Sequence, residues 1–175
     1  MPESEPKWIE GALCPLETPC FIFDEMLQGA AEWLRVAGYD TTLPAGGTRD
    51  RRIIEIAVAQ DRWLVTRDRE LSRHPRAPCY VIPVSGNSLE ANLRDLTRLL
   101  DLDWFKAPFS RCKRCNVLLG SGNPDGGGLC VPADAEFISH CPYCRQVYWA
   151  GSHVRRMRHQ LMRFNKWRPW PLKVP

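Results

Sequence analysis

Two cysteine pairs constrain the fold of this chain more than any other feature. The pairs Cys112-x-x-Cys115 and Cys141-x-x-Cys144 are separated by 25 residues. Each pair fits a tight turn that directs two thiolates toward one point, and two such turns together form the tetrahedral four-sulfur shell that zinc prefers. The sequence therefore predicts a structural zinc site, with a closed shell that leaves no position for a reactant.

Other uses of these cysteines have to be weighed against zinc. A cytosolic chain disfavours two structural disulfides, and two matched pairs disfavour a single redox-active pair. His140 and Cys130 lie close enough in sequence to serve as substitute zinc ligands. Cys20 and Cys79 fall within short apolar runs, so we interpret them as ordinary core residues.

The N-terminal part of the chain alternates short apolar runs with segments of helical period. The runs predict strands at residues 20–23, 39–43, 62–66 and 79–84. A first helix is expected at residues 25–37, where Gly38 ends it. A second helix is expected from residue 50 onward. A third follows a capping pair of Asn87 and Glu90 and extends to residue 100. Because Pro83 cannot donate a hydrogen bond to a neighbouring strand, the last strand is expected to be short or to lie at an edge. This order predicts an α/β domain, with a parallel sheet and helices on both faces.

Three aspartates occupy related places in this pattern. Asp24 follows the first strand, Asp50 begins the helix after the second strand, and Asp68 comes two residues after the third strand. Ligands of open parallel sheets gather at the carboxyl ends of the strands, so we expect the three carboxylates to converge there. Because such a cluster repels itself, it favours a bound cation, and hard oxygen ligands suit magnesium or manganese. These ions polarise phosphates and lower the pKa of bound water.

Each aspartate also has a simpler interpretation. Asp24 and Asp68 could cap the turns that follow them, and Asp50 could be a first-turn acid favoured by the helix dipole. Weaker acidic candidates are also present, of which Asp40 is expected at the opposite edge of the sheet. These candidates are Glu25, Asp40, Glu55 and Asp61.

Charge is distributed unevenly between the two halves of the chain. Residues 1–106 contain 13 Lys or Arg and 17 Asp or Glu, whereas residues 107–175 contain 11 and 3. Residues 153–168 place apolar side chains at helical spacing and basic side chains elsewhere, which predicts a basic amphipathic helix. We expect its apolar stripe to dock on the protein and its basic face to bind nucleic-acid phosphates, although a membrane surface is an alternative. The basic candidates are Arg155, Arg156, Arg158, Arg163 and Lys166.

Four segments together resemble the Mut-7 C-terminal RNase family. They are FIFDEMLQGAAEWLRVAGYDT, RDRRIIEIAVAQDRWLVTRDREL, RCKRCN and HCPYCRQVYWAGSH. The resemblance implies a PIN-like nuclease domain followed by a zinc ribbon. It also implies that Asp24, Asp50 and Asp68 bind the metal of a phosphodiesterase site, and that Thr66 of the T-R-D motif orients or binds phosphate. PIN nucleases usually add a further acid from an extra helix, which residues 43–50 are too few to form.

The expected organisation has four parts. Residues 1–19 form an irregular segment, 20–105 a PIN-like nuclease domain, 106–153 a zinc ribbon, and 154–175 a basic helix and tail. The expected function is a metal-dependent endoribonuclease. A non-catalytic RNA- or ribosome-binding adaptor is the main alternative, and a toxin is less favoured because toxins usually lack the ribbon. Without a run of 18 apolar residues or a secretory signal, the chain is expected to be cytoplasmic, with no membrane contact and no assigned oligomeric state.

Overall fold

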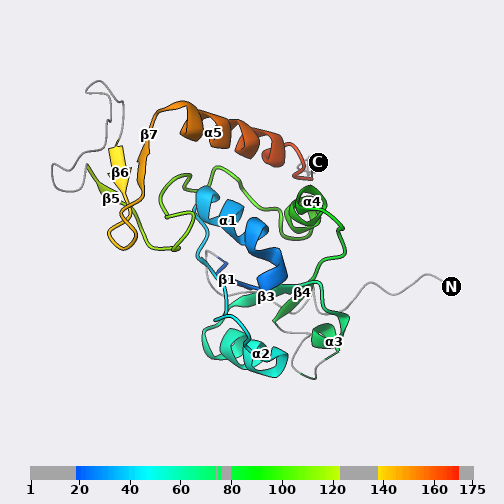
Figure 1. Ribbon diagram of the computed structural model, residues 1–175. Helices are drawn as coiled ribbons and strands as arrows, with labels where there is room; N and C mark the ends of the chain where they lie inside the picture. The colour runs from blue at the N-terminus through cyan, green and yellow to red at the C-terminus, as the bar shows by residue number, and fades with distance from the viewer. Residues whose placement is uncertain (1–18, 74, 76–79, 123–137, 170–175) are drawn as a thin grey trace. The chain divides into compact units, whose positions relative to one another are not determined.

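The computed structural model describes residues 19–73, 75, 80–122 and 138–169. The chain forms two compact units that are interleaved in sequence (Figure 1). The sheet unit contains residues 1–28 and 41–84, and the ribbon unit contains residues 29–40 and 85–175. The expected irregular segment lies outside the described residues except for its last position, and Cys79 and Cys130 lie outside them as well.

The sheet unit contains four parallel strands. They are β1 (Phe21–Phe23), β2 (Thr41–Thr42), β3 (Trp63–Thr66) and β4 (Val81–Pro83), in the spatial order β2-β1-β3-β4. Phe23 pairs with Val65, and Thr66 pairs with Pro83 on the edge strand β4. The predicted parallel sheet and the edge position of Pro83 are therefore confirmed, with strands shorter than expected.

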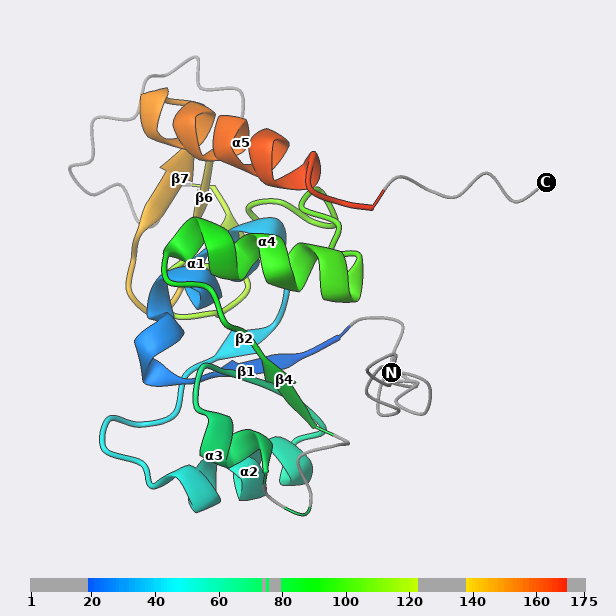
Figure 2. The same ribbon diagram turned by 90° about the vertical axis from the view of Figure 1, so that its right-hand side faces the viewer.

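Helices α2 (Asp50–Ala59) and α3 (Arg69–Ser72) lie on the same face of this sheet (Figures 1 and 2). Between sheet and helices lies a buried apolar cluster made of Ile22, Ile53, Ile54, Ala57, Leu64, Leu71 and Val81. Burial of each large aliphatic side chain stabilises the unit by about 1.5–3 kcal/mol. The isoleucines that recur at helical spacing after residue 50 therefore face the strands and form part of this cluster.

The helix expected at residues 25–37 has two parts. A 3₁₀ turn, η1 (Glu25–Leu27), is followed by α1 (Gln28–Ala37). Within the turn, Met26 is 75% exposed whereas Leu27 is buried. Gly38 has a φ of 100° and ends α1 as expected, in a conformation that other residues rarely adopt.

The ribbon unit contains α1 from Gly29 onward, α4 (Leu89–Leu100) and α5 (Ser152–Asn165). Ser88, rather than the expected Asn87, caps α4 by accepting a hydrogen bond from the Ala91 N–H at 3.2 Å. Helix α5 lies beside α4 (Figure 2). Among the described helices, none combines the length and the hydropathy that crossing a bilayer requires.

The predicted amphipathic character of α5 is confirmed. Its buried side chains are Val154, Met157, Leu161 and Phe164. The Phe164 ring lies 5.1 Å from Trp33, 5.0 Å from Trp104 and 4.9 Å from Trp167, measured between ring centroids. Arg94 lies over the Trp167 ring, so Trp167 takes part in internal packing.

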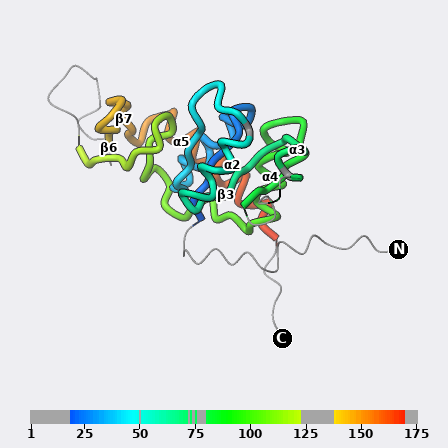
Figure 3. Tube along the Cα trace, turned by 90° about the horizontal axis from the view of Figure 1, so that it is seen from below, coloured from blue at the N-terminus to red at the C-terminus, as the bar shows by residue number. Residues whose placement is uncertain are grey.

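A small antiparallel sheet completes the ribbon unit. Its strands are β5 (Gly120–Ser121), β6 (Ile138–His140) and β7 (Val147–Trp149), with β6 in the centre (Figure 1). Figure 3 shows β6 and β7 side by side from below. The connection between β6 and β7 contains the second cysteine pair. An isolated antiparallel bridge between Arg111 and Leu118 encloses the first pair. Both pairs therefore lie in turns that join antiparallel segments.

Candidate metal centres

The two cysteine turns share one backbone pattern. The Asn116 N–H donates to the Cys112 carbonyl, and the Arg145 N–H donates to the Cys141 carbonyl, each at 2.9 Å. Asn116 and Arg145 both have positive φ, at 65° and 59°. This conformation reverses the chain directly after the second cysteine of each pair. The two turns are thus equivalent in local structure.

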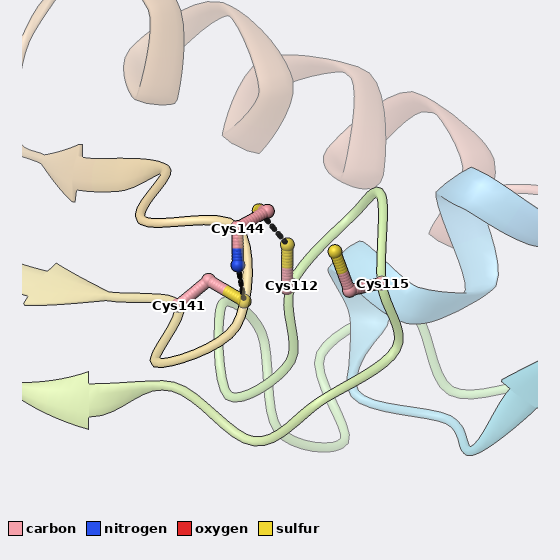
Figure 4. A group of neighbouring side chains, drawn as sticks. All are labelled: Cys112, Cys115, Cys141 and Cys144. Carbon is pink, nitrogen blue, oxygen red and sulfur yellow. Dashed lines mark hydrogen bonds between the residues drawn. The ribbon is translucent and has the colours of Figure 1, made fainter.

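The four sulfur atoms converge as the sequence predicted. The Sγ atoms of Cys112, Cys115, Cys141 and Cys144 all lie within 4.8 Å of one another, and none is in a disulfide (Figure 4). The Cys112 and Cys144 Sγ atoms are 3.6 Å apart. A tetrahedral zinc ion with Zn–S bonds of about 2.3 Å separates its sulfur ligands by about 3.8 Å. The donor set and its spacing therefore fit zinc, and the disulfide alternative is wrong for these cysteines.

The pKa values of the thiols indicate that this centre needs a cation to hold four thiolates. Burial raises the pKa of Cys112, but hydrogen bonds from the Tyr148 hydroxyl and from the N–H groups of Cys115 and Arg114 outweigh it, and the pKa falls to about 7. Burial and the neighbouring sulfur groups raise the pKa of Cys115 to about 12. Burial also raises the pKa of Cys141. Four thiolates at this distance consequently require a metal ion to stabilise their charge.

Two side chains hold the first cysteine turn from different sides. Arg35 Nη1 donates to the carbonyl oxygens of Lys113 at 3.1 Å and Arg114 at 2.8 Å. The Tyr148 hydroxyl accepts from the Lys113 N–H at 2.9 Å and donates to Cys112 Sγ at 3.5 Å. Tyr148 is 4% exposed, so its ring is buried in the ribbon unit. The first turn is therefore fixed by groups from α1 and β7.

Sequence analysis did not single out Arg35. The residue is 4% exposed and lies next to Leu34 in the apolar segment that became α1. It also follows Ala31 by four residues, so the two lie on one helix face. A basic residue on the buried side of a helix needs a partner, which is the signal that could have identified it.

Ion pairs add to the contact between α1 and the first turn. Lys113 Nζ lies 3.1 Å from a Glu32 carboxylate oxygen. Arg111 lies 3.3 Å from Asp40, which also accepts from the Asn116 side-chain amide at 2.9 Å. Asp40, a weaker candidate for the acidic site, thus belongs to the ribbon unit and pairs with the cysteine turn.

His140 is not a substitute ligand in the described structure. Its Nδ1 forms a hydrogen bond with the Gly122 carbonyl oxygen at 2.9 Å. The group of potential ligand atoms around the sulfur centre contains only the four cysteines. The four-cysteine prediction is therefore favoured over the alternative that used His140, while Cys130 falls outside the described residues.

A second candidate centre lies where β1 and β3 end in the sheet unit. Asp24 accepts hydrogen bonds from the Met26 N–H at 3.3 Å and from the Thr66 hydroxyl at 3.0 Å. Thr66 Oγ1 in turn accepts from the Asp68 N–H at 2.9 Å, and Asp68 accepts from the Glu70 N–H at 2.7 Å. Thr66 is fully buried. One hydrogen-bonded chain therefore connects Asp24, Thr66 and Asp68.

The two interpretations of Asp24 and Asp68 are compatible. Both residues cap the short helices that follow them, as the simpler interpretation expected. Both also lie at the same strand ends, as the metal interpretation expected. Asp50 begins α2, but its side chain lies outside the described residues. Among the described side chains, a group of three or more potential metal ligands occurs only at the cysteines.

The remaining acidic candidates have other surroundings. Glu55 pairs along α2 with Arg51 at 3.5 Å and with Arg52 at 3.0 Å. Asp61 is exposed and has a φ of 50°, which places it in the tight connection after α2. Glu25 is exposed beside Asp24.

The basic residues of α5 lie on its exposed face. The side chains are those of Arg155, Arg156, Arg158, Arg163 and Lys166. Arg163 approaches Glu90 at 3.5 Å, and Arg155 donates to the Ala150 carbonyl at 2.9 Å. These exposed contacts are weak and can exchange for other anions. The helix therefore presents positive charge to solvent.

A family model described as the Mut7-C RNAse domain matches residues 19–161. The chain belongs to this family. No curated protein and no solved structure matches it. The Mut7-C match spans both compact units and includes Asp24, Thr66, Asp68 and the four cysteines. The family supports a nuclease-type function and an RNA substrate. The matched range ends at Leu161 within α5, so Arg163 and Lys166 follow the Mut7-C region.

Proposed function

We propose that this protein is a metal-dependent endoribonuclease. The observation that carries the proposal is the hydrogen-bonded chain of Asp24, Thr66 and Asp68 at the ends of β1 and β3, in a member of an RNase family. Carboxylates at the carboxyl ends of parallel strands are placed where such sheets bind their ligands. Asp50, the first residue of α2, is proposed as the third carboxylate.

The proposed roles follow from the contacts of each residue. Thr66 donates to one Asp24 oxygen, while the Met26 N–H contacts the other, so the orientation of this carboxylate is fixed. The Glu70 N–H fixes Asp68 in the same way. A bound magnesium or manganese ion would polarise the phosphodiester and lower the pKa of attacking water. No side-chain nucleophile is required in this scheme.

The proposal includes a PIN-like arrangement and the four-part division of the chain. The parallel sheet and its helices support this arrangement. Residues 43–49 contain no helix, consistent with a site that lacks the extra helix and its fourth acid. The divisions at residues 20, 106 and 154 remain part of the proposal, as does a cytoplasmic location, where the thiols of the zinc centre would stay reduced.

RNA binding is assigned to the ribbon and to α5. The exposed arginines of α5 can contact several phosphates, and the segment after residue 106 carries far more basic than acidic residues. Phosphate contacts position an RNA strand without defining its sequence. In this scheme one unit holds the substrate, and the carboxylates of the other cut it.

A comparison of Asp68→Asn with the wild type tests catalysis. Protein purified in buffer free of divalent cations, with its zinc content verified, is mixed in excess with labelled RNA at saturating manganese. Asparagine retains the cap but lacks one charge of the metal site, so cleavage should fall at least about 100-fold while folding and RNA binding persist. Asp61→Asn removes the same charge at an exposed position and should cut RNA like the wild type. Equal rates for the Asp68 variant and the wild type would contradict the proposal.

An RNA-binding adaptor is the second candidate function. It is favoured by the observation that Asp24 and Asp68 both act as helix caps, which suffices to explain their presence without a metal. If the wild type binds diverse RNAs tightly but cleaves none of them with manganese or magnesium, the adaptor function replaces the nuclease function.

A further inference from the structure

The contact between Arg35 and the first cysteine turn is more specific than a surface ion pair. Arg35 Nη1 donates to the carbonyl oxygens of Lys113 and Arg114, the two residues between Cys112 and Cys115. The residue is 4% exposed, so its charge is buried at this contact. Burying a guanidinium is costly unless its surroundings are electronegative.

The geometry of the peptide group connects these two carbonyls to the sulfur of Cys112. In a trans peptide the C=O and the next residue's N–H point in opposite directions. The Lys113 carbonyl shares its peptide with the Arg114 N–H, and the Arg114 carbonyl shares its peptide with the Cys115 N–H. These two N–H groups are the backbone donors to Cys112. Two peptide groups therefore lie between the Arg35 guanidinium and the Cys112 sulfur, with their dipoles aligned.

The charges around the turn fit this arrangement. Zinc with four thiolates carries a net charge of −2, which favours a buried cation nearby. The Glu32 carboxylate, the sulfurs of Cys112 and Cys115 and the Asp40 carboxylate all attract the Arg35 guanidinium. Glu32 and Asp40 also pair with Lys113 and Arg111 of the first turn.

We propose that Arg35 is a positioning residue for the zinc centre, which orients the peptide groups of residues 113–115 so that their N–H groups donate to Cys112. Zinc retention then depends on α1, a helix that ends more than 70 residues before Cys112, the first of the four zinc ligands. The second turn has the same backbone pattern, whereas the two Arg35 hydrogen bonds described above go to the first turn. The two turns should therefore respond differently to the loss of Arg35.

The test compares three variants of the full chain with the wild type. Arg35→Met removes the charge and both hydrogen bonds, whereas Arg35→Lys keeps a charge on a different donor geometry. Arg98→Met, at an exposed position on α4, is the matched control. Zinc transfer to a coloured chelator should be about 10- to 100-fold faster for Arg35→Met, intermediate for Arg35→Lys, and unchanged for Arg98→Met.

Spectroscopy distinguishes this role from general stability. In the zinc-bound protein, the amide proton resonances of Arg114 and Cys115 should move in Arg35→Met, while those of Tyr143 and Cys144 stay in place. In the cobalt-substituted protein, the sulfur-to-metal charge-transfer band should move to longer wavelength, because a thiolate with weaker hydrogen bonds is more easily oxidised. A folded Arg35→Met protein with wild-type zinc transfer and unchanged Arg114 and Cys115 resonances would overturn the proposal.

If Arg35→Met does not fold, hydrogen exchange in the wild-type protein tests the proposal instead. The Arg35 side-chain N–H groups and the Arg114 and Cys115 amides should lose protection together when a chelator removes zinc. Retained protection of the Arg35 N–H groups after zinc removal would contradict the inference. All these readouts report on zinc, so failure here leaves the RNase proposal untouched.

Discussion

The sulfur centre and the carboxylate centre are built in different ways. Each cysteine turn is a local structure whose backbone pattern serves to bring two sulfurs together, and the four atoms converge within 4.8 Å. Asp24 and Asp68 instead have a second role as helix caps, which holds them in place with or without a metal. In the sulfur centre the metal is the cause of the local order, whereas in the carboxylate centre the metal would be added to residues that are already ordered.

This comparison predicts opposite responses to loss of metal. The sulfur centre should lose its structure, because the raised pKa values of Cys115 and Cys141 show that their thiolates form only when a metal ion binds them. The carboxylate centre should keep its structure, because its hydrogen bonds come from the backbone and from Thr66. Four experiments test the contrast, in order of decreasing expected effect.

Cys141→Ser should produce the largest change. Structural zinc contributes roughly 10–16 kcal/mol of apparent binding free energy, which this variant should largely lose. Elemental analysis should fall from one zinc per chain to nearly none, and hydrogen exchange should become fast at residues 111–121 and 138–149. Residues 51–66 of the sheet unit should remain protected. Cys20→Ser, outside the cluster, is the control, and a zinc-free Cys141→Ser protein with a protected ribbon would break the comparison.

Substitutions of Asp24 should separate its two roles. Asp24→Asn keeps a good cap, so its free energy of unfolding should lie within about 0.5 kcal/mol of the wild-type value. Asp24→Ala loses the cap and should lower the free energy of unfolding by about 1 kcal/mol. Both should lose manganese-dependent cleavage by at least about 100-fold, since both lack the carboxylate. Urea unfolding and single-turnover cleavage measure the two effects. Retained cleavage by Asp24→Asn would show that Asp24 is only a cap.

Thr66→Val should measure the hydrogen-bonded connection between the aspartates. Valine keeps the shape but leaves the Asp68 N–H without its acceptor and removes the donor to Asp24. The expected loss of unfolding free energy is about 1–3 kcal/mol, with slower cleavage because Asp24 is no longer oriented. Thr66→Ser should restore most of the unfolding free energy and most of the cleavage rate. If the valine variant is as stable and as active as the wild type, the connection has no role.

Neutralising the basic face of α5 should affect binding alone. Replacing Arg155, Arg156 and Arg158 by Gln should weaken RNA binding and reduce the slope of log K against log salt by about 2–3. Single-turnover cleavage at saturating protein should stay within about twofold of the wild type. The control replaces Arg51, Arg52 and Arg98 by Gln. An equal loss of slope in the control would indicate general charge rather than a specific surface on α5.

Short-range patterns made much of this molecule predictable from sequence. The cysteine spacing, the isoleucines at helical period in α2 and the apolar stripe of α5 each reflect local geometry or periodicity. The parallel sheet followed from the alternation of elements. Such features depend on neighbours within a few residues or on a repeated period.

Features that depend on distant partners were predicted less well. His140 was considered as a ligand because of its proximity to Cys141, but strand pairing directs it to Gly122. Arg35 has its acceptors 78 and 79 residues away, so no local pattern could assign them.

The separation between Arg35 and its acceptors also affects the order in which the chain can fold. During synthesis α1 is complete long before residues 113 and 114 leave the ribosome, so Arg35 spends that interval without its carbonyl partners. The first cysteine turn can form within a few residues, whereas its attachment to α1 must close a loop of nearly 80 residues. Contacts of such long range slow folding. We therefore expect the first cysteine turn to form before its attachment to α1.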